Sequence, residues 1–103
     1  MLTSKQRAYL RGLANGLDAV VQVGKDGIGD NLIAQVDGVL EKRELIKGTV
    51  LENSLLSARE AAEAIAAATN SEVVQVIGAK FVLFRIQQNK DKRKIELPKT
   101  RKK

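Results

Sequence analysis

Helical and strand-like segments alternate along this chain, and the alternation constrains its fold more than any other feature of the sequence. Apolar residues at three- and four-residue spacing, or capping boxes, predict three helices, at 3–14, 30–42 and 57–68. Short β-branched runs between turn-forming residues predict four strands, at 19–23, 44–51, 72–77 and 80–87. The order α-β-α-β-α-β-β therefore indicates one domain.

This order predicts an α/β fold of the two-layer α+β kind, with a four-stranded mixed sheet. Two strand–helix–strand crossovers give parallel strands, and a two-residue turn at Gly78-Ala79 then gives an antiparallel last strand. Alternation in that strand places Phe81, Leu83 and Arg85 on one side of the sheet, and Val82 and Phe84 on the other.

Local signals predict where the helices begin and end. Capping boxes are expected at Thr3–Gln6 and at Ser57–Glu60. Asp30 is interpreted as the N-cap of the second helix, and Asn15-Gly16 and Asn70 as helix ends that tolerate a left-handed backbone. Gly38 is unfavourable inside a helix, which suggests a close backbone contact there.

The composition argues against an enzyme. The chain has no Cys and no His, so it lacks a disulfide framework, a thiolate zinc site and the commonest general base. Its serines lie in cap or turn contexts, and Asp26 and Asp30 have no third acidic neighbour that would complete a magnesium site. We expect no catalytic residues, no metal and no cofactor. No apolar run is long enough for a membrane span or a secretory signal, so we expect a cytoplasmic protein with no membrane partner.

The positive charge is concentrated at the C-terminal end. The net charge is +6, yet residues 1–89 carry as many acidic as basic side chains. The excess lies in residues 90–103, with eight Lys and Arg against two acidic residues. We therefore expect a single domain at 1–89 followed by a basic tail at 90–103. Such a tail is typical of proteins that bind polyanions, above all nucleic acid, although a purely solubilising tail stays open.

The segment Gly24-Lys25-Asp26-Gly27 is the strongest local signal of a binding site. It joins an expected strand to the start of an expected helix, where free backbone amides and the helix dipole attract phosphate. Lys25 adds a positive charge at the tip. A G-x-x-G segment in such a position clamps the nucleotide backbone in RNA-binding KH modules, but an ordinary strand-to-helix turn has the same residues.

Other basic residues become candidates for RNA binding only if the fold brings them near this loop. They are Arg7, Arg11, Lys47, Lys80 and Arg85. For each of them, a solvated surface position is the alternative. Because the chain has only three aromatic residues, base stacking is expected to contribute little, and specificity is expected to come from RNA shape.

Four ordered segments resemble the CRM domain, and in particular its small stand-alone bacterial form, the YhbY-type RNA-binding proteins. They are LTSKQRAYLRGLA, VVQVGKDGIGDNLI, ELIKGTVL and VQVIGAKFVLFR followed by KRKIELPK, which together cover roughly residues 2–99. The resemblance implies a fold like the C-terminal domain of bacterial translation initiation factor three. It also implies RNA binding through the loop at 24–27, in association with precursors of the large ribosomal subunit.

Matching the segments residue by residue extends the expected RNA-binding set. Lys47, Lys80 and Arg85 fall where the family tends to be basic, and Lys92, Arg93 and Lys94 match the basic run before KIELP. The expected function is thus a non-enzymatic RNA-binding protein of ribosome assembly, with large-subunit ribosomal RNA or a pre-ribosomal particle as its partner. A protein–protein adaptor that docks on a ribosomal protein is the alternative. The sequence does not determine the oligomeric state, and a monomer is favoured.

Overall fold

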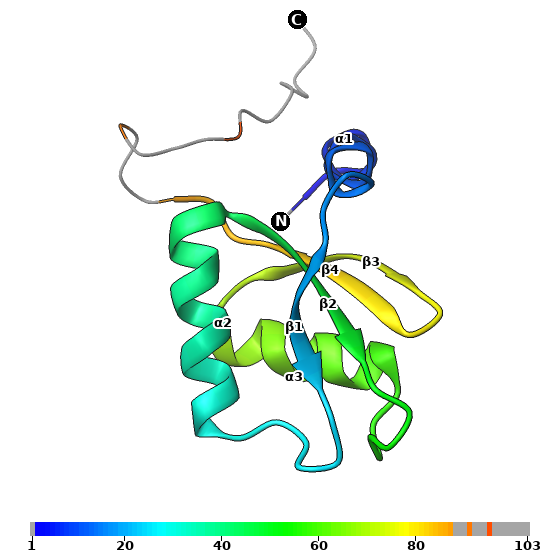
Figure 1. Cartoon of the computed structure of the whole chain (residues 1–103). Helices are drawn as coiled ribbons and strands as arrows, with labels where there is room; N and C mark the ends of the chain where they lie inside the picture. Colours follow the sequence, from blue (N-terminus) through cyan, green and yellow to red (C-terminus); the bar gives the residue numbers. More distant parts are fainter. Residues whose placement is uncertain (1, 88–90, 92–94, 96–103) are drawn as a thin grey trace, which may run out of the picture.

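The computed structural model describes residues 2–87, 91 and 95, and within them seven elements follow the expected order (Figure 1). The helices are α1 (Ser4–Ala14), α2 (Asp30–Arg43) and α3 (Ala58–Thr69). The strands are β1 (Ala19–Val23), β2 (Leu45–Val50), β3 (Glu72–Ile77) and β4 (Lys80–Phe84). In this part of the chain, no helix has the length and apolar character that a membrane crossing requires.

The four strands form one mixed sheet in the order β1-β2-β4-β3. Strand β1 pairs in parallel with β2, whereas β4 pairs in an antiparallel sense with both β2 and β3. This confirms the expected fold class and the antiparallel last strand. Gly78 has a φ of 57°, which is the left-handed conformation that the tight β3–β4 turn needs and that glycine adopts without strain.

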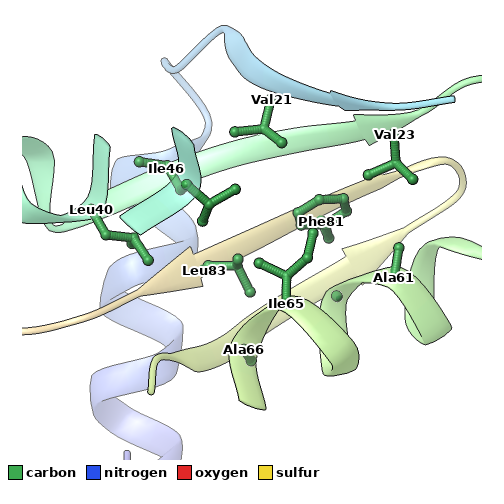
Figure 2. Close-up of a cluster of buried hydrophobic side chains, with 11 residues drawn as sticks. Val21, Val23, Leu40, Ile46, Ala61, Ile65, Ala66, Phe81 and Leu83 are labelled. Atoms are coloured by element: carbon green, nitrogen blue, oxygen red, sulfur yellow. The ribbon is translucent and has the colours of Figure 1, made fainter. Parts of the chain in front are cut away.

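Each face of the sheet carries its own hydrophobic cluster. Helices α2 and α3 cover one face, where Phe81 and Leu83 of β4 meet Leu40 and Ile65 of the helices (Figure 2). Helix α1 covers part of the opposite face, and its Leu10 belongs to a second cluster there. That cluster also contains Ala14, Leu45, Val74, Val82 and Phe84. The side-chain alternation expected for β4 is therefore confirmed.

The two capping boxes form as the sequence predicts. In α1, the amide of Gln6 donates to Thr3 Oγ1 at 3.1 Å, and the Gln6 side chain accepts from the Thr3 amide. The same reciprocal pair joins Ser57 and Glu60 at the start of α3. Asn70 ends α3 with a φ of 58°, in the left-handed region. The C-cap of α1, Asn15, is instead right-handed, with a φ of −56°.

Gly38 and Gly48 have very different surroundings in the fold. An added Cβ at Gly38 would meet nothing within 4 Å, so the close contact expected there is absent. At Gly48 of β2, by contrast, an added Cβ would overlap the buried ring of Phe81. Glycine is therefore required in β2, where the Phe81 ring occupies the space of the missing side chain, and is dispensable in α2.

The sequence predicted that Glu44 would begin a strand, but Glu44 is instead the C-cap of α2. It has a φ of 67°, and only 1% of its surface is exposed. Its backbone amide donates to the carbonyl of Leu40, and its own carbonyl accepts from the amide of Arg85, both at 2.8 Å. These bonds hold Glu44 at the junction between helix and sheet.

Candidate functional site

The loop at 24–27 is a turn with an exposed tip at the carboxyl end of β1 (Figure 1, cyan). The amide of Gly27 donates to the carbonyl of Gly24 at 3.0 Å, and Gly27 has a φ of 72°. Lys25 and Asp26, at the tip, are exposed. The turn thus presents its backbone and the Lys25 ammonium to solvent, which an anion-binding loop requires.

Helix α2 begins differently from the other two helices. Its N-cap is Gly29, which makes no side-chain capping hydrogen bond, so the expectation that Asp30 is the N-cap is wrong. Asp30 lies in the first turn of the helix instead. The first amides of α2 therefore have no side-chain cap and are left for water or a ligand. The carboxylates of Asp26 and Asp30 reduce the positive potential here, so backbone amides and Lys25 must provide the attraction for an anion.

The connection between β2 and α3 packs against the start of this loop. The amide of Leu51 donates to the carbonyl of Val23 at 2.8 Å. A Cβ added to Gly24 would lie 3.5 Å from Leu51 Cδ1 and 3.6 Å from Asn53 Oδ1, which is ordinary van der Waals contact. The two connections are therefore neighbours at one end of the sheet, and their contact positions the start of the loop.

Lys47 and Lys80 lie on the face of the sheet that α1 partly covers. Lys47 is opposite Val82 and Lys80 is opposite Thr49, so the two lysines share one face of adjacent strands. Together with Asn15, Gln75, Ile77 and Val82, they line a shallow hollow of about 160 Å³. No ion pair joins either lysine to another residue in the described ranges.

The register relates this hollow to the loop. Val23, the last residue of β1, pairs with Val50, and the neighbouring Thr49 pairs with Lys80. Because adjacent strands are about 4.8 Å apart, the backbone of Lys80 lies about 10 Å across the sheet from the end of β1, where the loop begins. The fold therefore brings Lys25 and Lys80 to one end of the sheet, whereas Lys47 pairs with Ala19, the first residue of β1, and lies farther from the loop.

Arg85 does not join this group. Its guanidinium lies on the opposite face of the sheet, 2.6 Å from Asp37 Oδ1 and 3.3 Å from Glu41 Oε1, and donates to the carbonyl of Thr69 at 2.9 Å. The side chain is 19% exposed. The geometry thus places Arg85 in a structural link between α2, α3 and the end of β4.

The two arginines of α1 lie on a third part of the surface. The guanidinium of Arg7 donates to the carbonyl of Val73 and so ties α1 to the edge strand β3. Arg11 follows one turn later and is half-buried. The remaining expected RNA-binding residues, Lys92, Arg93 and Lys94, lie outside the described residues. Ile95, from the expected tail, is half-buried against the cluster that contains Leu10.

Sequence reasoning missed two residues of the hollow, Asn15 and Gln75. Asn15 was expected only to end a helix, and the alternation of β3 gave no reason to place Gln75 beside Lys80. In the part of the chain that the structure describes, no three acidic side chains gather closely enough to hold a metal ion.

The architecture defines a class of small α/β proteins in which a glycine-rich turn leads from an edge strand into a helix without a side-chain cap. This helix covers one face of the sheet, and two lysines lie on the other face. Residues 2–85 match the family model of the CRS1/YhbY (CRM) domain, and the chain belongs to this family.

Relatives cover almost the whole chain. One is the probable RNA-binding protein YqeI of Bacillus subtilis, 44% identical over 95% of this chain and 100% of its own length. Another is an RNA-binding protein of Haemophilus influenzae, 34% identical over 94% of this chain and 95% of its own. A solved structure from Staphylococcus aureus, described as "a putative RNA binding protein", superimposes with a TM-score of 0.76. It is 50% identical and covers 95% of this chain and 100% of its own.

Proposed function

We propose that this protein binds RNA without catalysing a reaction, and that its target is large-subunit ribosomal RNA in a precursor particle. The observation that carries the proposal is the turn Gly24–Gly27, which has an exposed tip, precedes the uncapped start of α2 and lies at the same end of the sheet as Lys80. Family membership and the names of the relatives support RNA as the ligand. The association with ribosome assembly, the cytoplasmic location and a monomeric state are part of the proposal.

In this mechanism, the loop holds the phosphate backbone. The amides of the turn and of the first turn of α2 donate to phosphate oxygens, and Lys25 adds a charge-assisted contact. Lys47 and Lys80 extend the positive track along the sheet face. The basic residues at 90–103 raise affinity by releasing counterions from the RNA.

The test compares two charge reversals that change the net charge equally. Lys25→Glu should weaken binding to ribosomal RNA fragments by roughly tenfold, which corresponds to about 1.4 kcal/mol. Lys42→Glu is the matched control, because it is exposed near the other end of α2, about 20 Å from the loop in a helix of this length. Binding is measured by fluorescence anisotropy at several salt concentrations. Equal affinities of the two variants would contradict a role for the loop.

A protein–protein adaptor is the second candidate, and one observation favours it. Leu55, in the connection between β2 and α3, is 93% exposed, and Ile77 is 63% exposed at the same end of the sheet. Exposed apolar side chains of this kind are common at protein interfaces. An adaptor would bind naked ribosomal RNA only weakly, and Lys25→Glu would have no more effect than Lys42→Glu.

A further inference from the structure

An irregularity in β3 turns Gln75 away from the protein core. Val73 pairs with Leu83 on the face that α2 and α3 cover, but the next pair in the register is Gln75 with Val82, which leaves Val74 as an extra residue. Val74 belongs to the cluster beneath α1, as does Val82. With strict alternation, Gln75 would instead face Phe81 in the main core. The bulge therefore directs the amide of Gln75 into the hollow beside Lys80.

The hollow combines three kinds of chemistry within one small space. Val82 is a buried apolar floor and Ile77 an exposed apolar wall. Asn15 and Gln75 each supply a side-chain amide, which carries both donors and an acceptor. Lys47 and Lys80 supply positive charge on the same face.

The polar groups of the hollow have unused hydrogen-bonding capacity. Neither amide makes a side-chain hydrogen bond to a residue in the described parts of the chain. The volume of the hollow, about 160 Å³, is smaller than the roughly 300 Å³ of pockets that enclose whole small-molecule ligands. A ligand that fits this hollow has one small group with an apolar face and a polar edge. It also carries negative charges on both sides of that group, within reach of the two lysines. A nucleobase within a polynucleotide has this combination of features.

We propose that this hollow holds one unstacked base of single-stranded RNA. The face of the base contacts Val82 and Ile77, the amides of Asn15 and Gln75 bind its edge, and Lys47 and Lys80 bind the adjoining phosphates. The inference rests on the proposed function and adds base discrimination to it, whereas the sequence predicts that specificity comes from RNA shape because few side chains can read bases. The loop at 24–27 then binds the backbone of the same RNA strand. The backbone of Lys80, at the edge of the hollow, lies about 10 Å across the sheet from the end of β1, where this loop begins.

The experiment measures base preference in the full-length protein. Its probes are fluorescein-labelled rA, rC and rU homopolymers of about 12 nucleotides, within the site sizes of single-strand binding folds. The wild-type protein should prefer one of the three by about fivefold or more, as expected when side-chain amides pair with a base edge. The double variant Asn15→Ala, Gln75→Ala should bind all three with the same affinity and an unchanged salt dependence. Gln35→Ala is the matched control, since this exposed amide is on α2, which covers the opposite face of the sheet.

A second measurement does not depend on a variant. In NMR spectra, the side-chain amide signals of Asn15 and Gln75 should shift when the preferred homopolymer is added, while those of Gln35 stay in place. Equal wild-type affinities for the three homopolymers, or a preference that survives in the double variant, would overturn the inference. Either result is compatible with a strong effect of Lys25→Glu, so a failure here is distinguishable from a failure of the proposed function.

Discussion

The backbone amide of Ile95 donates a hydrogen bond of 2.9 Å to Oε1 of Glu44, 51 positions earlier in the chain. The other carboxylate oxygen of Glu44 accepts from the amide of Gln87, also at 2.9 Å. One buried side chain therefore fastens two separate points of the C-terminal segment to the end of α2. This contact explains how a residue beyond the last strand packs against the domain.

Replacing Glu44 with Ala should lower the free energy of unfolding by about 2–4 kcal/mol, because two backbone amides lose a charged acceptor. Urea denaturation measures the change, with Glu52→Ala as a control at an exposed acidic residue. Glu44→Gln should have a smaller effect, since its carbonyl oxygen can still accept one of the two bonds. A change of less than about 0.5 kcal/mol in Glu44→Ala, the size typical of a surface substitution, would show that the carboxylate does not hold the segment.

Arg85→Lys should destabilise the fold by about 1–3 kcal/mol, although it keeps the charge. An ammonium cannot reproduce the planar set of donors that reaches both the Asp37 carboxylate and the Thr69 carbonyl. Below the melting temperature, RNA affinity should equal that of the wild-type protein. Thermal melting measures the loss of stability, and fluorescence anisotropy measures the RNA affinity. An RNA-binding defect in a fully folded variant would show that Arg85 contacts RNA.

Alanine at two glycines should have opposite effects on stability. Gly48→Ala places a methyl group inside the Phe81 ring position and should cost about 1–3 kcal/mol through overpacking. Gly38→Ala adds a methyl group in open space on a helix and should stabilise the protein by about 1 kcal/mol. The melting temperatures of the two variants, compared with that of the wild-type protein, show whether each substitution stabilises or destabilises the fold. A stable Gly48→Ala variant would mean that the Phe81 ring can move aside.

The basic residues near the C-terminus should contribute more to the salt dependence of RNA binding than the same number of basic residues elsewhere in the chain. Changing Lys99, Arg101, Lys102 and Lys103 to Gln leaves Ile95 and its anchoring hydrogen bond in place. The slope of log affinity against log salt should become less steep by about 0.7 for each RNA phosphate that the variant no longer neutralises. The control changes Lys5, Lys42, Arg43 and Arg59 to Gln, four basic residues of the folded body. Identical slopes in the two variants would show that the tail only adds net charge.

Short-range features of the structure were predictable because they depend on neighbours in the sequence. Thr3 and Ser57 cap helices through residues three positions later, and Gly78 forms a turn between adjacent strands. The loop at 24–27 was found for the same reason, since the four residues themselves determine the turn. The position of Lys80 relative to that loop was not predictable, because it depends on the order β1-β2-β4 within the sheet.

The order of the elements, the fold class and the glycine turn follow from local sequence patterns, because hydrophobic period, capping and turn chemistry act over a few residues. Three features are apparent only in the folded chain: Arg85 links two helices, Glu44 is buried as an anchor, and Gln75 faces a hollow with Lys80. These three outcomes depend on partners 16 to 51 positions away or on a one-residue bulge, and no local pattern specifies the geometry of such contacts.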